Sequence, residues 1–179
     1  MNVYQLKATL RHVRPPVWRR ILVPADTKLP KLHRILQVVM GWHDSHMHAF
    51  RFKGEQYGLS GRDFPDMFKS ERNVRLDQIA GPRARFVYEY DFGDSWEHDI
   101  VVEKILPAEQ GKHYPLCVAG KRACPPEDCG GVLGYENLVE IMSNPDHEEY
   151  AEMSEWLGGV FDPEAFHLEV VNDELRSLR

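Results

Sequence analysis

The sequence lacks any apolar segment long enough to cross a membrane. Its densest apolar stretch, residues 35–42, is interrupted by Gln37 and Gly41 and is far shorter than the roughly 20 residues that a spanning helix needs. The first seven residues alternate in polarity and do not form a basic region followed by an apolar run. We therefore expect neither a signal peptide nor contact with the membrane interior.

Cysteine is scarce as well. The chain has three cysteines, an odd number, and together with the expected lack of a secretion signal this argues against a disulfide framework. We expect reduced thiols and a location in a bacterial or archaeal cytoplasm.

Low-complexity tracts and internal repeats are also missing. The hydrophobic fraction of 42% and the charged fraction of 28% are ordinary for a globular protein. A chain of 179 residues suits one domain, which would bury roughly 70% of the surface of its unfolded form. We expect a single domain over residues 1–179.

Charge is distributed unevenly behind a net charge of −6. Residues 1–34 carry eight basic side chains and one acid, whereas residues 127–179 carry fourteen acids and two bases. One interpretation is that the two ends attract each other across the fold. The other is a basic patch that binds nucleic acid or a protein partner. Its candidate residues are Arg11, Arg14, Arg19, Arg20, Lys31 and Arg34.

The N-terminal half alternates between strand and helix patterns. Residues 3–11 and 17–23 have the period of two that predicts half-buried strands, separated by Pro15 and Pro16. Residues 29–40 have helical spacing, with Pro30 in the first turn and Gly41 after the last. A further strand is expected over residues 46–53, and a short helical turn over 76–79.

A hairpin over residues 83–105 is the clearest local pattern. One face of its first strand carries Phe86, Tyr88, Tyr90 and Phe92, and one face of its second carries Trp96, His98, Ile100 and Val102. A three-residue loop over 93–95 would pair Phe92 with Trp96 and keep all the rings on one side.

The C-terminal part begins with an irregular stretch. Residues 107–134 show no periodicity and contain all three cysteines, so we expect a long loop. Helices are predicted over residues 135–142, 147–156 and 163–178. The fold class is therefore α+β, with a mostly antiparallel sheet.

Three histidines are candidate ligands for a divalent metal such as zinc. His46 and His48 lie two residues apart on a predicted strand, and His98 occupies the corresponding face of the hairpin. Core histidines bonded to backbone or tyrosine hydroxyls would give the same pattern. If a metal is bound, Asp94 or Glu97 could act as the base of a hydrolase.

The cysteines offer a second, weaker metal pattern. Cys117, Cys124 and Cys129 could bind zinc together with His113, but six and then four residues separate them, unlike the close pairs of structural zinc sites. Buried inert thiols are the alternative. A cysteine nucleophile would need a base, and no pattern places one beside any of these thiols.

Acids alternate along the other face of the hairpin. Glu89, Asp91, Glu97 and Asp99 could hold a divalent cation or a basic partner, although a solvated sheet face would look the same. Asp91-Phe92-Gly93 matches a kinase motif in isolation, but the chain lacks a Gly-rich phosphate loop and a His-Arg-Asp sequence.

Several longer motifs together resemble one family, the plasmid pRi ORF-3-like proteins, also labelled the insertion-sequence passenger TnpR family. The resemblance implies a single α+β domain in a bacterial or archaeal protein that is often encoded on a mobile element, and it implies no established activity. A serine recombinase would need a serine near its N-terminus, and the first serine here is Ser45. The motifs are Pro16-Val17-Trp18-Arg19-Arg20, Leu32-His33, Met40-Gly41-Trp42, His46-Met47-His48, Tyr90-Asp91-Phe92-Gly93-Asp94-Ser95-Trp96-Glu97-His98 and Ala123-Cys124-Pro125-Pro126-Glu127-Asp128-Cys129-Gly130-Gly131.

Two functions of different classes follow. The first is a non-enzymatic module that binds nucleic acid or a protein through the basic N-terminal region. The second is a metal-dependent enzyme that uses the strand histidines.

Overall fold

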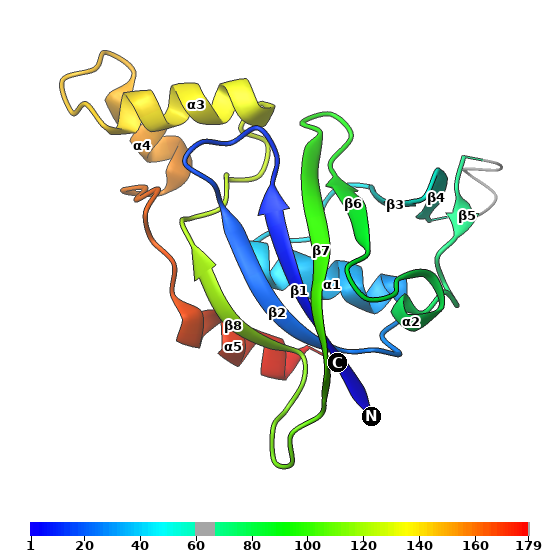
Figure 1. Cartoon of the computed structure of the whole chain (residues 1–179). Coiled ribbons are helices and arrows are strands. Elements are labelled where there is room, and N and C mark those ends of the chain that lie inside the picture. The colour runs from blue at the N-terminus through cyan, green and yellow to red at the C-terminus, as the bar shows by residue number, and fades with distance from the viewer. Residues whose placement is uncertain (60–66, 179) are drawn as a thin grey trace.

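One sheet of eight strands forms the centre of the protein (Figure 1). The computed structural model describes residues 1–59 and 67–178. The strand order is β5-β4-β3-β6-β7-β1-β2-β8, and every neighbouring pair is antiparallel except β4 and β5. The strands are β1 (Asn2–Leu10), β2 (Trp18–Pro24), β3 (His48–Phe52), β4 (Glu55–Gly58), β5 (Lys69–Ser70), β6 (Arg85–Tyr90), β7 (Trp96–Pro107) and β8 (Leu116–Lys121). The helices are α1 (Leu29–Met40), α2 (Leu76–Ile79), α3 (Gly131–Met142), α4 (Tyr150–Leu157) and α5 (Leu168–Ser177).

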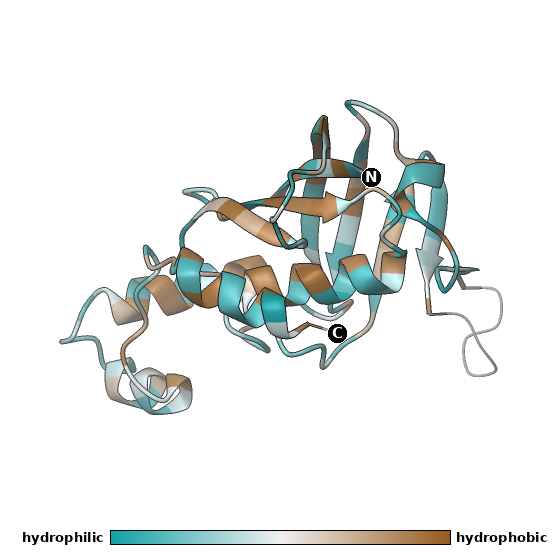
Figure 2. Ribbon diagram, turned by 90° about the horizontal axis from the view of Figure 1, so that it is seen from below, coloured by the Kyte–Doolittle hydropathy of each residue, from teal (hydrophilic) through white to brown (hydrophobic). Residues whose placement is uncertain are grey.

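One face of the sheet packs on α1, and α5 packs beside that helix and β8 (Figures 1 and 2). Alternation along β1 turns Leu6 and Ala8 inward, where they are fully buried. From α1, Leu32, Ile35 and Leu36 meet them in the same core. Each such leucine or isoleucine contributes roughly 1.5–3 kcal/mol by burial. This core fixes the position of α1, and hence of the groups at its two ends.

The other face of the sheet carries charged side chains that pair across strands. Arg11 of the β1–β2 connection contacts Glu97 and Asp99 of β7, both at 2.7 Å. Arg20 of β2 contacts Glu103 at 2.6 Å. These two arginines of the basic N-terminal region therefore pair with acids of the hairpin. Within residues 1–59 and 67–178, no ion pair joins an arginine or lysine of residues 1–34 to an acid of the C-terminal region.

The α+β fold is confirmed, and several predicted elements match closely. Helix α1 has the predicted bounds, and α2 occupies the predicted short turn. No helix in the described part of the chain is long and apolar enough to span a bilayer.

The hairpin has the predicted faces but a different register. Tyr90 pairs with Trp96 and Tyr88 with His98, so the expected pairing is wrong by two residues. The connection contains five residues, 91–95, because Asp91 and Ser95 both adopt positive φ and end the strands early. A shift of two residues preserves side-chain parity, so the inward rings within β6 and β7 are confirmed. The expectation for Phe92 is wrong, because it lies in the connection and is 38% exposed.

The C-terminal boundaries needed larger corrections. The stretch 107–134 is not one loop, since β8 adds an edge strand beside β2 and α3 already begins at Gly131. Gly130, at φ 89°, is the N-cap residue of α3. Helix α4 starts at residue 150 and α5 at residue 168, later than expected in both cases.

Candidate functional site

Three connections meet at one end of the sheet, beyond the C-terminus of α1. They are residues 41–47 between α1 and β3, residues 91–95 between β6 and β7, and residues 122–130 between β8 and α3. Hydrogen bonds join them: Trp42 Nε1 donates to the Pro125 carbonyl (2.9 Å) and Gly130 N donates to Asp94 Oδ2 (3.1 Å). These hydrogen bonds therefore tie the 122–130 connection to both of the others, although the three are far apart in the sequence.

Asp91 shapes the connection between β6 and β7. It adopts φ 56°, a conformation that aspartate tolerates better than most residues. Its Oδ1 accepts hydrogen bonds from Gly93 N (2.9 Å) and Asp94 N (3.3 Å). Its second oxygen, Oδ2, lies 3.6 Å from His46 Nε2. The buried carboxylate thus stabilises the turn and also faces the histidine.

His46 is surrounded by carboxylates. Its Nε2 lies 2.9 Å from Asp128 Oδ1, 3.6 Å from Asp91 Oδ2 and 3.7 Å from Glu127 Oε2. The nitrogen is screened from solvent, yet it makes no hydrogen bond of acceptable geometry with any of them. In the described part of the chain, His46, Asp91 and Asp128 are the one group of three such residues whose ligand atoms lie within 4.8 Å of one another. We call these three residues and Glu127 the histidine–carboxylate cluster.

Glu127 is oriented by its neighbours. Tyr90 Oη donates to Glu127 Oε1 at 3.0 Å, and His43 N donates to the same oxygen at 2.8 Å. Burial raises the pKa of Tyr90, so its hydroxyl stays protonated and remains a donor. Outer partners of this kind fix the direction in which a metal-ligating carboxylate points.

His48 and His98, the other predicted metal ligands, lie in the core, apart from this cluster. The His48 ring stacks on His33 at 3.5 Å, and its Nε2 lies 3.1 and 3.0 Å from the two oxygens of buried Glu71. His98 is fully buried, with Nδ1 3.3 Å from the Tyr88 carbonyl. Burial lowers the pKa of His98 to about 4. The structure does not bring the three imidazoles together as one ligand set.

The core also holds a polar chain that sequence patterns did not indicate. Gln37 Nε2 donates to Tyr88 Oη (2.9 Å), which lies 2.8 Å from His33 Nδ1. His33 Nε2 lies 2.7 Å from Asp44 Oδ1. Burial lowers the pKa of His33 to about 4, with His48 acting in the same direction. A neutral ring that accepts from Tyr88 and donates to Asp44 satisfies all of these contacts.

The two candidate bases have separate surroundings. Asp94 lies beside the cluster and accepts the Gly130 N–H described above. Glu97 lies on the outer face of the sheet, where it pairs with Arg11 and Arg51. Burial raises the pKa of Glu97, but hydrogen bonds from the two arginines outweigh it and lower the pKa below its ordinary value.

The three cysteines are free. Cys117 is buried, and its backbone N–H and carbonyl both bond to the Asn172 side chain. Burial raises the pKa of the Cys129 thiol to about 12 and that of Cys124 further. In the described residues they form no common ligand group with one another or with His113.

The basic candidates divide into three groups. Arg11 and Arg20 are neutralised by the hairpin acids. Arg19 is buried, and its guanidinium donates to the carbonyls of Val39, Trp18 and Lys121 and lies over the Phe166 ring. Burial lowers its pKa.

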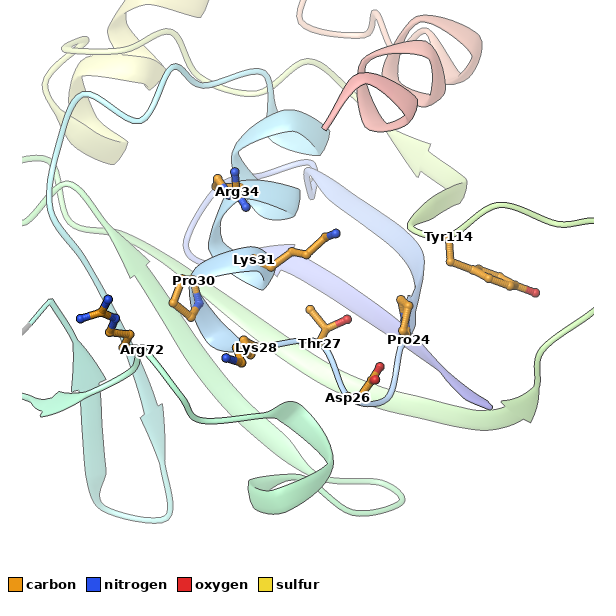
Figure 3. Close-up of a pocket in the computed structure, with 9 residues that line it drawn as sticks. All are labelled: Pro24, Asp26, Thr27, Lys28, Pro30, Lys31, Arg34, Arg72 and Tyr114. Carbon is orange, nitrogen blue, oxygen red and sulfur yellow. The ribbon is translucent and has the colours of Figure 1, made fainter. Parts of the chain in front are cut away.

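Three basic candidates stay at the surface. Arg14 is exposed in the connection between β1 and β2. Lys31 and Arg34 line a pocket at the start of α1 (Figure 3).

The comparisons with known proteins identify a family without adding a function. A sequence profile described as "Plasmid pRiA4b ORF-3-like protein" matches residues 2–170. A relative named "Uncharacterized protein y4hQ", from Sinorhizobium fredii, is 42% identical over 160 residues, which cover 88% of this chain and 81% of the relative.

A solved structure is similar over almost its whole length. It is titled "Crystal Structure of Protein of Unknown Function MM3350 from Methanosarcina mazei Go1" and superposes with a TM-score of 0.87 at 40% identity. The match covers 94% of this chain and 96% of the other.

Sequence reasoning missed the assembly of the histidine–carboxylate cluster. Alternation along the hairpin predicts Asp91 on the outer face, which is wrong, because its buried carboxylate faces His46. Glu127 and Asp128 belong to a longer motif that does not link them to His46. The available signal was that three of the motifs carrying the family resemblance contain the cluster residues.

Proposed function

Because the chain belongs to the plasmid pRiA4b ORF-3-like family, and neither relative's name states an activity, we propose its function from geometry: it binds a divalent cation at the histidine–carboxylate cluster. His46, Asp91 and Asp128 are the proposed ligands, with Glu127 as a fourth. A cation would lie among one imidazole nitrogen and three carboxylate oxygens.

One observation carries this proposal. His46 Nε2 is inaccessible to solvent and makes no hydrogen bond, although three carboxylates face it within 3.7 Å. Screened polar atoms are normally hydrogen-bonded, and an exception calls for an explanation. A cation held by His46, Asp91 and Asp128, whose ligand atoms lie within 4.8 Å of one another, would satisfy the nitrogen and offset the repulsion among the acids.

The donor set limits the choice of cation. Carboxylates suit Mg²⁺, Ca²⁺ and Mn²⁺, whereas an imidazole adds preference for transition metals. One nitrogen and up to three carboxylates favour Mn²⁺ or Zn²⁺.

The outer side of the cluster is open to solvent. The Asp128 side chain is 68% exposed, so a water molecule or a ligand has room to reach a bound cation. Such a cation lowers the pKa of its water and polarises a coordinated oxygen. We propose metal-dependent hydrolysis as the activity open to this site, with Asp94 as the nearby carboxylate.

Titration calorimetry tests the proposal. Untagged protein, stripped with a chelator and dialysed, is titrated with MnCl₂ and separately with ZnCl₂. We expect one cation per chain, and Asp128→Asn or His46→Gln should weaken binding by at least about 10-fold. Asparagine tolerates the positive φ of position 128, which is 57°, so the first variant should fold.

A matched control separates a local effect from a general loss of charge. Asp173→Asn removes one exposed acid from α5 and should leave the affinity unchanged. The proposal fails if the parent protein binds neither cation at millimolar concentration, or if the two cluster variants bind as tightly as the control.

A further inference from the structure

A basic pocket lies at the start of α1, at the opposite end of that helix from the histidine–carboxylate cluster (Figure 3). Helix α1 has twelve residues and is therefore about 18 Å long. The pocket has a volume of about 460 Å³, which is within the range of small-molecule sites. We call it the basic pocket. Its lining includes four cations and one acid: Lys28, Lys31, Arg34, Arg72 and Asp26.

The cations of the basic pocket are not neutralised as those of the sheet are. In the described residues, no carboxylate lies within 4.0 Å of Lys31, Arg34 or Arg72. The Lys28 ammonium donates to an uncharged partner, Asn73 Oδ1, at 3.2 Å. Gathering these like charges is unfavourable without a counterion. A bound anion would remove that repulsion.

Backbone hydrogen bonds build the pocket from two separate segments. Leu29 N donates to the Val74 carbonyl (2.9 Å), and Leu76 N donates to the Thr27 carbonyl (2.9 Å). These bonds place Arg72 beside the first turn of α1. Since the Leu29 N–H is already used and residue 30 is a proline, side chains and not the helix terminus would hold the anion.

The pocket continues toward an aromatic ring. Figure 3 shows Arg72 on one side of α1 and Tyr114 across the pocket on the other, with the Lys31 side chain extending toward Tyr114. A second hollow of about 280 Å³ shares Lys31 and Tyr114 and adds His113 and Arg176 to the lining, although Arg176 is already paired with Asp173. An occupant that follows both hollows would be extended, with its negative charge beside the cations of the basic pocket.

We propose that the basic pocket binds the phosphates of a single-stranded nucleic acid, with a base against Tyr114. Lysine and arginine together suit phosphate oxygens, and arginine can engage them with two hydrogen bonds. Aromatic rings supply stacking platforms for unpaired bases. The same phosphate chemistry could come from a free nucleotide, and the experiment distinguishes these two sources.

Fluorescence anisotropy with labelled oligouridylate of 4, 8 and 12 nucleotides tests this inference. We expect binding that tightens with length and weakens steeply between 50 and 200 mM salt. Lys31→Gln combined with Arg34→Gln should weaken binding by about 10-fold or more and flatten the salt dependence, because about two phosphate contacts are lost. Tyr114→Leu should weaken binding by about 10-fold with an unchanged salt slope.

The matched control removes the same charge elsewhere. Lys104→Gln combined with Lys121→Gln changes two exposed lysines outside the basic pocket and should change the affinity by less than about 2-fold. Displacement of the label by uridine monophosphate, with no dependence on length, would assign the pocket to a free nucleotide and support the phosphate chemistry. No binding of strand or nucleotide at 50 mM salt, or equal losses in the two double variants, would overturn it.

Discussion

The two ends of helix α1 differ in charge, and both oppose the helix dipole. The start of the helix is surrounded by lysines and arginines, and its end faces the histidine–carboxylate cluster. The first turn has no acid and the last turn has no base, the reverse of the arrangement that stabilises a helix by about 0.3–1 kcal/mol per charge. We infer that these charges serve ion binding and not the stability of α1.

The two ends also differ in how they are assembled. The basic pocket draws most of its cations from consecutive residues 28–34, with Arg72 added by a neighbouring segment. The cluster draws its four residues from three connections that only the fold brings together. A change in packing should therefore disturb the cluster more than the basic pocket.

The largest predicted effect concerns the core between the two ends of α1. The protein should lose stability at acid pH because of buried His98. Burial keeps His98 neutral and lowers its pKa from 6.5 to about 4. Between these values the unfolded chain takes up a proton that the folded chain does not, so stability is complete above pH 6.5 and falls as the pH falls toward 4. A shift of this size corresponds to roughly 3 kcal/mol.

Urea unfolding at pH 7.5 and pH 4.5 measures this dependence. His98→Gln removes the titrating group, so the difference between the two pH values should shrink by roughly 3 kcal/mol relative to the parent protein. His12→Gln, at an exposed position, is the control. An identical pH difference in the parent and His98→Gln would show that His98 is not its source.

The second effect tests the tertiary assembly of the cluster. A side chain at Gly134 would overlap the Cys129 carbonyl oxygen, so Gly134→Ala must displace the segment that carries Glu127 and Asp128. We expect the free energy of unfolding to fall by about 2 kcal/mol because of overpacking. Cation binding should weaken, and binding of the labelled oligouridylate should not change. Urea unfolding and the two binding assays measure these effects.

Gly81→Ala is the matched control, because an added Cβ there would meet nothing within 4 Å. Its effect on stability should stay below about 1 kcal/mol. Equal behaviour of the two alanine variants would contradict the tight contact between α3 and the preceding segment.

The smallest effect concerns the outer face of the sheet. Arg11 pairs with Glu97 and Asp99, and these side chains are 30%, 23% and 54% exposed, so Arg11→Ala should cost no more than about 1 kcal/mol. The affinity for the labelled oligouridylate should change by less than about 2-fold, because this arginine is already neutralised. A large loss of affinity for the oligouridylate would instead place the nucleic-acid surface on the sheet. Fluorescence anisotropy distinguishes the sheet from the basic pocket.

Regular periodicity explains what the sequence could predict. The spacing in residues 29–40 predicted α1 with its observed bounds, and the alternation in the hairpin predicted the inward rings of β6 and β7, although not the exposure of Phe92. The register was missed because positive φ at Asp91 and Ser95 is a property of the folded turn. The edge strand β8 was missed because an irregular sequence can still pair when β2 offers a free edge.

The candidate sites follow the same division. Lys31 and Arg34 could be named from the local density of basic residues, and the structure places both on one pocket. His46 could be predicted as a metal ligand because His48 lies two residues away. Its proposed carboxylate partners, however, lie 45, 81 and 82 positions further along the chain. No local pattern links residues at such distances, since only the sheet and the contact between α3 and the 91–95 turn bring them together.

The central claim is that the two ends of α1 bind ions of opposite charge independently. The most direct test titrates Mn²⁺ and labelled oligouridylate into the same three proteins: the parent, Asp128→Asn, and Lys31→Gln combined with Arg34→Gln. We predict that Asp128→Asn weakens only the binding of Mn²⁺ and that the double variant weakens only the binding of oligouridylate. Equal loss of both ligands in either variant, or no binding of either ligand by the parent, would contradict this account.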